Sequence, residues 1–210
     1  MMGTAALLFP VHALIFALAP GLAEELLGAR WSGTAPVIRI TAIASVLGLL
    51  GDIVEPILNA FGRPAAVTAM EAVQSLLLIL SVWVLADAYG LPGEAASWLP
   101  AITVSQGLAL LLLRRLFEHP FRGTLGALAV LAAAAFGGCA AFWIDHAVGG
   151  LAGVVLGAAT GAVLIGSALL AGERGLGLGL ASAAVQLFPQ LSGALERLGL
   201  VDAATEEASE

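Results

Sequence analysis

The chain has 210 residues, of which 60% are hydrophobic and 11% are charged, and its net charge is −7. Soluble domains carry about 25% charged residues, so this composition excludes an ordinary soluble protein and predicts a chain embedded in a lipid bilayer. The eight positive charges are all arginines and form no basic patch, which excludes nucleic acid as a partner.

Six stretches are long and apolar enough to cross a bilayer, which takes about 20 residues of helix. The backbone finds no hydrogen-bond partner in lipid, so each span should be helical. The predicted spans are residues 3–22, 36–59, 65–88, 95–115, 124–144 and 148–171. Glycine, proline or charged residues separate them. We therefore predict an all-α polytopic membrane helix bundle made by residues 1–172.

The first span contains His12, beside Pro10. A histidine inside a span can line a polar pathway, or it can be hydrogen-bonded between helices. We keep His12 as a candidate cavity residue, with the structural role as the alternative.

Acids and amides gather in the second and third spans. Asp52, Glu55 and Asn59 follow one another at i, i+3 and i+7 and share one helical face. Glu71 and Gln74 reach a similar depth, because the third span begins on the side where the second ends. An ionised side chain at mid-membrane costs at least about 2.5–3.5 kcal/mol, so it normally faces a partner or a water-filled cavity. These five residues are our candidates for a cavity that handles a coupling ion.

Glu55 and Glu71 also have a structural interpretation. Both lie close enough to one side of the membrane to reach headgroup water, with Arg63 in the connecting loop as a counter-ion. Arg63 and Arg39 are our candidates for binding a lipid headgroup, and simple anchoring of Arg39 is the alternative. In the fourth span, Gln106 either faces the cavity or bonds to a neighbouring helix.

The last span carries glycines at four-residue spacing. Small residues in this pattern allow two helix backbones to approach closely, so we predict a packing role. They are Gly149, Gly153, Gly157 and Gly161.

Two signals predict the orientation of the bundle. Arginines favour the cytoplasmic side, and tryptophans favour the membrane interfaces. One side of the predicted bundle carries Arg63, Arg114, Arg115, Arg122, Arg174 and Arg197. The opposite boundary carries Trp31, Trp83, Trp98 and Trp143. We therefore predict a multi-pass protein of the inner (plasma) membrane with both termini in the cytoplasm.

The C-terminal region differs from the spans. Residues 173–200 place leucines on one helical face and polar residues on the other, which predicts an amphipathic helix that lies in the interface or packs on the bundle. Residues 201–210 are rich in acids and predict a disordered tail.

Several local patterns resemble a known family. The turn LLGARW, the helix start APVIRI, the loop GRP and the later YGLPGE are similar to the C-terminal half of polysaccharide-biosynthesis flippases. These belong to the multidrug, oligosaccharidyl-lipid and polysaccharide exporter superfamily. The resemblance covers roughly residues 5–115. It implies two bundled lobes around a central cavity, of which this chain supplies part of the second.

The resemblance implies transport rather than enzymatic activity. The expected function is that of the C-terminal part of a flippase that moves lipid-linked oligosaccharide across the inner membrane. The expected partners are the lipid bilayer, that lipid-linked oligosaccharide, and either a first lobe or a second copy of the chain. The sequence has no metal-ligand cluster, nucleotide loop or nucleophile motif, so we expect no metal and no cofactor.

Two other classes of function stay open at this point. One is an integral-membrane transferase that uses Asp52 and Glu55 as acid and base. The other is a non-catalytic membrane scaffold or an inactive fragment.

Overall fold

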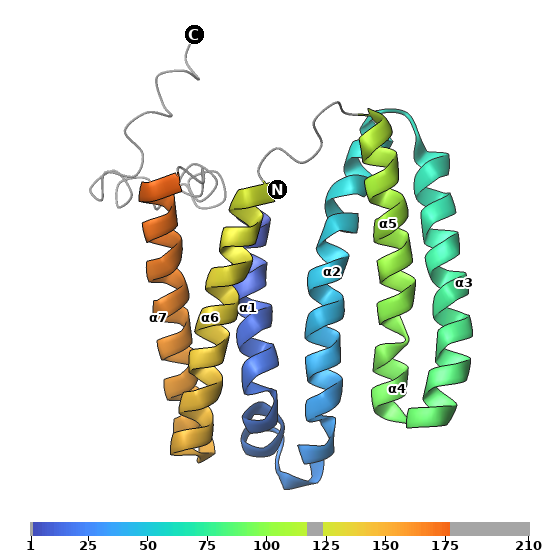
Figure 1. Cartoon of the computed structure of the whole chain (residues 1–210). Helices are drawn as coiled ribbons and strands as arrows, with labels where there is room; N and C mark the ends of the chain where they lie inside the picture. Colours follow the sequence, from blue (N-terminus) through green and yellow to red (C-terminus); the bar gives the residue numbers. More distant parts are fainter. Residues whose placement is uncertain (1, 117–123, 177–210) are drawn as a thin grey trace.

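The computed structural model describes residues 2–116 and 124–176, and these form helices joined by short turns (Figure 1). The elements are α1 (Met2–Gly21), α2 (Ala35–Ala60), α3 (Pro64–Tyr89), α4 (Leu91–Ala96), α5 (Trp98–Leu116), α6 (Thr124–Val148) and α7 (Gly150–Leu176). Six spans within the described residues are long and apolar enough to cross a membrane. The predicted all-α polytopic bundle is confirmed, and the chain is a multi-pass membrane protein.

Prolines and glycines mark the ends of the helices. Proline occupies the first turn of α2, α3 and α4, where its missing N–H would have no helical partner. Gly90 and Gly149 end α3 and α6 with φ of 63° and 70°, a conformation that a side chain would disfavour. The short turns that follow make neighbouring helices antiparallel.

The connection between α1 and α2 has regular structure of its own. It contains a π-helix at Leu22–Leu26 and a 3-10 helix at Ala29–Thr34. Pro20, just before the π-helix, has no N–H to donate to the carbonyl of Phe16 four residues earlier. The regular α pattern is thus interrupted here, and the chain continues in wider and then tighter turns.

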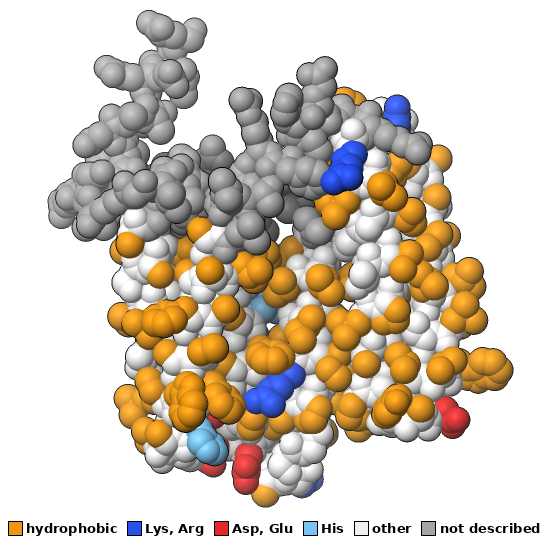
Figure 2. Space-filling view, in the orientation of Figure 1, with side chains coloured by type: hydrophobic (Ala, Val, Ile, Leu, Met, Phe, Trp, Pro, Cys, Tyr) orange, Lys and Arg blue, Asp and Glu red, His pale blue; other side chains and the backbone are white. Residues whose placement is uncertain are grey.

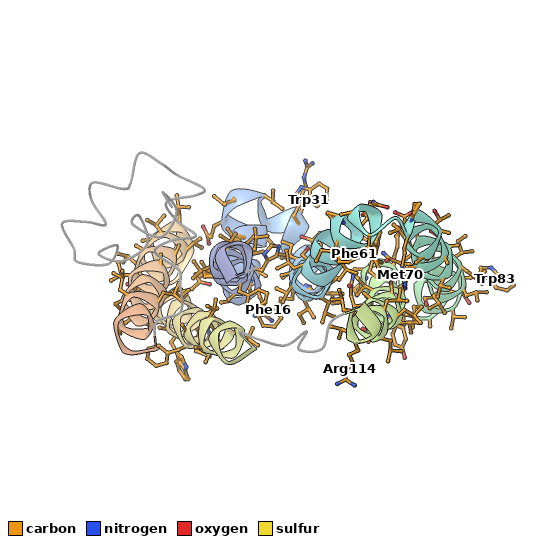
Figure 3. The ribbon with its side chains drawn as sticks, turned by 90° about the horizontal axis from the view of Figure 1, so that it is seen from above. Phe16, Trp31, Phe61, Met70, Trp83 and Arg114 are labelled. Atoms are coloured by element: carbon orange, nitrogen blue, oxygen red, sulfur yellow. The ribbon has the colours of Figure 1, made fainter. Side chains whose placement is uncertain are left out.

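The helices form two groups of three. α1, α6 and α7 pack together, as do α2, α3 and α5, and α1 lies against α2 where the groups meet (Figures 1 and 3). One buried cluster centres on Ala17, Leu18 and Ala141 in the first group. The second group has a larger cluster at Val54, Leu58, Val67, Met70, Ala109 and Leu113. Each group therefore has its own apolar core.

The two ends of the bundle hold different segments. The start of α1, the turn at residues 61–63 and the end of α7 lie at one end, which we call the proximal end (Figure 1). Residues 22–34, 90–97 and 149 lie at the other, the distal end. Trp31 and Trp98 also lie at the distal end, in keeping with the predicted row of tryptophans. Which end faces the cytoplasm stays a prediction.

The glycine ladder packs α7 against α6, as predicted. A Cβ atom on Gly157 would lie 2.7 Å from the carbonyl oxygen of Ala141, and one on Gly161 would lie 2.9 Å from that of Gly137. Gly149 belongs to the turn instead. Backbone contact at this distance requires residues without side chains.

The C-terminal predictions concern residues beyond the described part of the chain. α7 continues to Leu176, past residue 172, where we placed the end of the membrane domain. The amphipathic helix at residues 173–200 lies outside the described residues from 177 onward, and so does the acidic tail at 201–210. Both stay predictions.

Candidate functional site

A polar pocket lies between α2, α3 and α5, with a volume of about 440 Å³. Four of the predicted candidates line it: Glu55, Glu71, Gln74 and Gln106. The two carboxylates are exposed, Gln74 is half-buried, and Gln106 is only 8% exposed. The structure therefore brings together polar groups from three helices that the sequence separates by up to about fifty residues.

Two glycines on α2 allow the close approach of α5. A Cβ atom on Gly51 would lie 2.7 Å from Nε2 of Gln106, and one on Gly48 would lie 3.1 Å from Cδ1 of Ile102. Because neither glycine has a side chain, the amide of Gln106 can lie against the α2 backbone. The Gln106 amide oxygen, Oε1, is buried and has no hydrogen-bond partner within the described residues.

The pocket lies at a depth that hydrocarbon would occupy in a bilayer. At about 1.5 Å of rise per residue, Glu55 and Glu71 lie about 8–11 Å from the proximal ends of their helices. Gln74 and Gln106 lie about 15 Å from the proximal ends of α3 and α5, near the middle of a membrane about 30 Å thick. Met70, part of the neighbouring core, points into the space between the three helices (Figure 3).

Two predicted residues of this region lie outside the polar pocket, and the side chain of a third is not described. Asn59 is exposed on α2, beyond the pocket toward the proximal end. Arg63 is exposed in the turn between α2 and α3, where its backbone N–H donates to the carbonyl of Leu58 at 2.9 Å. Asp52 belongs to α2, but its side chain lies outside the described part of the structure.

A second cavity, an apolar groove, lies between α1, α2 and α6 and has a volume of about 630 Å³. His12 and Arg39, predicted for the cavity and for a headgroup, line this groove and not the polar pocket. Nδ1 of His12 lies 2.8 Å from the carbonyl oxygen of Leu8, one turn earlier in its own helix. This contact lies within α1, so it is not the hydrogen bond between helices that we gave as the alternative for His12.

Arg39 joins α2 to α1. Its Nε donates to the carbonyl of Phe16 at 3.2 Å, the carbonyl to which Pro20, four residues later, has no N–H to donate. The guanidinium carbon lies 5.5 Å from the centre of the Phe16 ring, at cation–π distance. No carboxylate among the described residues forms an ion pair with Arg39.

Sequence reasoning missed parts of both cavities. Ser75 lines the polar pocket and follows directly on the predicted Gln74. The wall that α6 contributes to the groove was not predicted, and it includes Cys139, Phe142 and Trp143. Small residues on α6 were the available signal, since they leave room between helices.

Comparison with known protein families, with curated proteins and with solved structures finds no match. Within residues 2–116 and 124–176, no group of three or more His, Cys, Asp or Glu side chains could hold a metal ion. The resemblance to flippases therefore stays a prediction from the sequence patterns.

Proposed function

We propose that the chain is a membrane transport protein, the C-terminal part of a flippase that moves lipid-linked oligosaccharide across the inner membrane. The observation that carries this proposal is the polar pocket. Two exposed carboxylates and a buried amide oxygen with no partner among the described residues line one cavity inside membrane-spanning helices. The class of substrate rests on the sequence resemblance alone.

The physical support comes from the exposure of Glu55 and Glu71. A charged group facing hydrocarbon costs at least about 2.5–3.5 kcal/mol, so a surface with two of them is poorly suited to lipid contact. Water or a polar protein surface over the pocket removes that cost. In a two-lobed transporter this surface faces the central cavity, and the other lobe or a second copy of the chain completes it.

The acid pair then has a role in coupling. Two carboxylates on adjacent helices bind a cation more tightly when the helices approach, because the cation then offsets the repulsion between their charges. Occupancy of the pocket thus biases the distance between α2 and α3. Alternating access requires such a difference between two states of the bundle.

The proposal is tested with the full chain in lipid vesicles. Lipid-linked oligosaccharide with a fluorescent sugar is added, and a membrane-impermeant reductant bleaches the label on the outer leaflet. Vesicles with the wild-type chain should lose the protected signal faster than protein-free vesicles. The double variant Glu55→Gln/Glu71→Gln should transport the lipid at least about tenfold more slowly per inserted molecule than the wild type. A factor of this size is typical of coupling between sites.

The matched control removes an acid that lies outside the pocket. Glu24→Gln, in the exposed connection between α1 and α2, should transport as the wild type does. The proposal is wrong if correctly inserted wild-type chain, alone or with a first lobe, moves the lipid no faster than bare vesicles do.

A further inference from the structure

The apolar groove between α1, α2 and α6 has the dimensions of a lipid chain. Its walls are apolar apart from His12 and Arg39. Along α6 the lining runs from Leu131 to Trp143, which corresponds to about 18 Å of helix. One leaflet of a bilayer with a core of about 30 Å has a similar depth. The volume of about 630 Å³ lies within the usual range of small-molecule pockets, about 300–1,000 Å³.

The groove has a positive charge toward one end. Arg39 lies in the second turn of α2, near the distal end. Phe16 on α1 and Trp143 on α6 line the groove and also lie near the distal end. The deeper part of the groove, toward Leu131 and Leu47, is apolar. An amphiphile with its headgroup at the distal interface and its chain toward the membrane centre matches this order. Hydrophobic side chains dominate the face shown in Figure 2, and charged ones lie mostly toward its ends.

Arg39 is held in place but keeps donors for a ligand. The bond from Nε to the Phe16 carbonyl fixes the guanidinium over the Phe16 ring. Its two Nη groups make no hydrogen bond or ion pair within the described residues. A planar guanidinium offers paired N–H groups that suit phosphate oxygens, and a positive charge inside a span favours an anionic partner.

We infer that this groove binds an anionic glycerophospholipid, with the phosphate on Arg39 and one acyl chain between α2 and α6, against α1. The charge complementarity and the length of one leaflet both select a lipid of the surrounding membrane as the occupant. The site is separate from the polar pocket and does not depend on the proposed transport function. It makes Arg39 a lipid-binding residue that also joins the two helix groups.

The first test compares two lipids with the same chains, phosphatidylglycerol and phosphatidylcholine. The full chain in neutral detergent is titrated with each, and bound lipid is counted by native mass spectrometry. The wild type should bind phosphatidylglycerol about five- to tenfold more tightly than phosphatidylcholine. One arginine near an anionic headgroup contributes an affinity difference of about this size. Arg39→Gln should reduce this preference to about one.

Arg30→Gln is the matched control. Arg30 also lies at the distal end over an aromatic ring, 5.8 Å from the centre of Trp31, but it does not line the groove. It should keep the preference for phosphatidylglycerol. Equal binding of the two lipids by the wild type overturns the inference, and so does a preference that survives Arg39→Gln or disappears in Arg30→Gln.

The second test needs no change to Arg39, and therefore holds even if Arg39→Gln fails to fold. Cys139 is the only cysteine of the chain, is exposed, and lines the groove. Phosphatidylglycerol should slow its alkylation by N-ethylmaleimide, a neutral reagent, several-fold more than phosphatidylcholine does. A cysteine outside the groove, Ser32→Cys in a Cys139→Ser background, corrects for the surface charge of the micelle. Equal protection by both lipids after this correction contradicts the inference.

Discussion

Gln106 lowers the stability of the fold but contributes a polar group to the pocket. Its side chain is buried, and Oε1 has no hydrogen-bond partner within the described residues. A buried polar atom without a partner costs about 1–3 kcal/mol, whereas an apolar side chain of similar volume costs nothing of this kind. A residue kept at such a cost is better explained by the pocket that it lines than by the fold.

This difference predicts the effect of Gln106→Leu. Removing the unpaired oxygen should stabilise the chain by about 1 kcal/mol and raise its Tm by about 2–4 °C in detergent. Transport per inserted molecule should fall, because the pocket loses an amide. A thermal melt of the purified variant decides the first point. A lower Tm would show that the amide is structural.

The polar pocket was predictable in part. Helical periodicity and the direction of the spans were enough to bring Glu55 near Glu71 and Gln74. Asn59 shares a face with Glu55 but lies beyond the pocket, since periodicity does not tell where the cavity between two helices ends. The position of Gln106 depends on the packing of α5 over Gly51, a tertiary contact with no local signal.

At the level of helices, the contact between α6 and α7 depends on the absence of side chains. Gly157 lies against the carbonyl of Ala141 on α6. A Cβ atom added to Gly157 would also lie 3.1 Å from Cδ2 of Leu18 on α1. Three helices therefore meet at one glycine. Neither the backbone nor the close-packed helices can move far to admit a methyl group.

We accordingly expect Gly157→Ala to destabilise the bundle by about 1–3 kcal/mol, the usual cost of overpacking. Gly166→Ala is the control on the same helix, because a Cβ atom there meets nothing within 4 Å. The control should be neutral or should stabilise, since alanine favours helix by about 1 kcal/mol over glycine. Thermal melts of both variants test the prediction. Equal effects of the two substitutions would contradict close packing at Gly157.

The helices themselves were predicted well, and the segments between them less so. Long apolar stretches admit only helices in a membrane, which is why all six spans were recognised. The charges and glycines of residues 22–34 indicated a break between two spans, but not the π-helix and the 3-10 helix that fill it. Turn-forming residues predict where an α-helix stops, but they do not determine which hydrogen bonds replace its own.

At the scale of the whole molecule, the two groups of three helices carry cavities of opposite character. The polar pocket belongs to α2, α3 and α5, whereas the apolar groove lies where α1 and α6 meet α2. α3 is at the edge of the arrangement, and its Trp83 is 80% exposed and points away from the other helices (Figure 3). α2 lines both cavities, so movement of this helix affects both.

The orientation of the bundle gives a direct prediction. With both termini in the cytoplasm, the distal end faces outward. In a Cys139→Ser background, Ser32→Cys should react with a membrane-impermeant maleimide added to intact cells. Ala65→Cys, exposed near the start of α3 at the proximal end, should react only after the cells are permeabilised. Labelling of Ala65→Cys alone in intact cells would reverse the predicted topology.

The central claim is that the polar pocket opens to water within the membrane, and two adjacent residues of α3 test it most directly. Ser75 is exposed and lines the pocket, whereas Leu76 is 59% exposed but does not line it. Each is replaced by cysteine in a Cys139→Ser background, and its reaction with a charged, water-soluble thiol reagent is followed in native membranes. Thiolates form and react in water but not in hydrocarbon, so Ser75→Cys should react at least about tenfold faster than Leu76→Cys. Equal rates at the two positions, or a faster reaction at Leu76→Cys, would contradict a hydrated pocket and the transport function proposed from it.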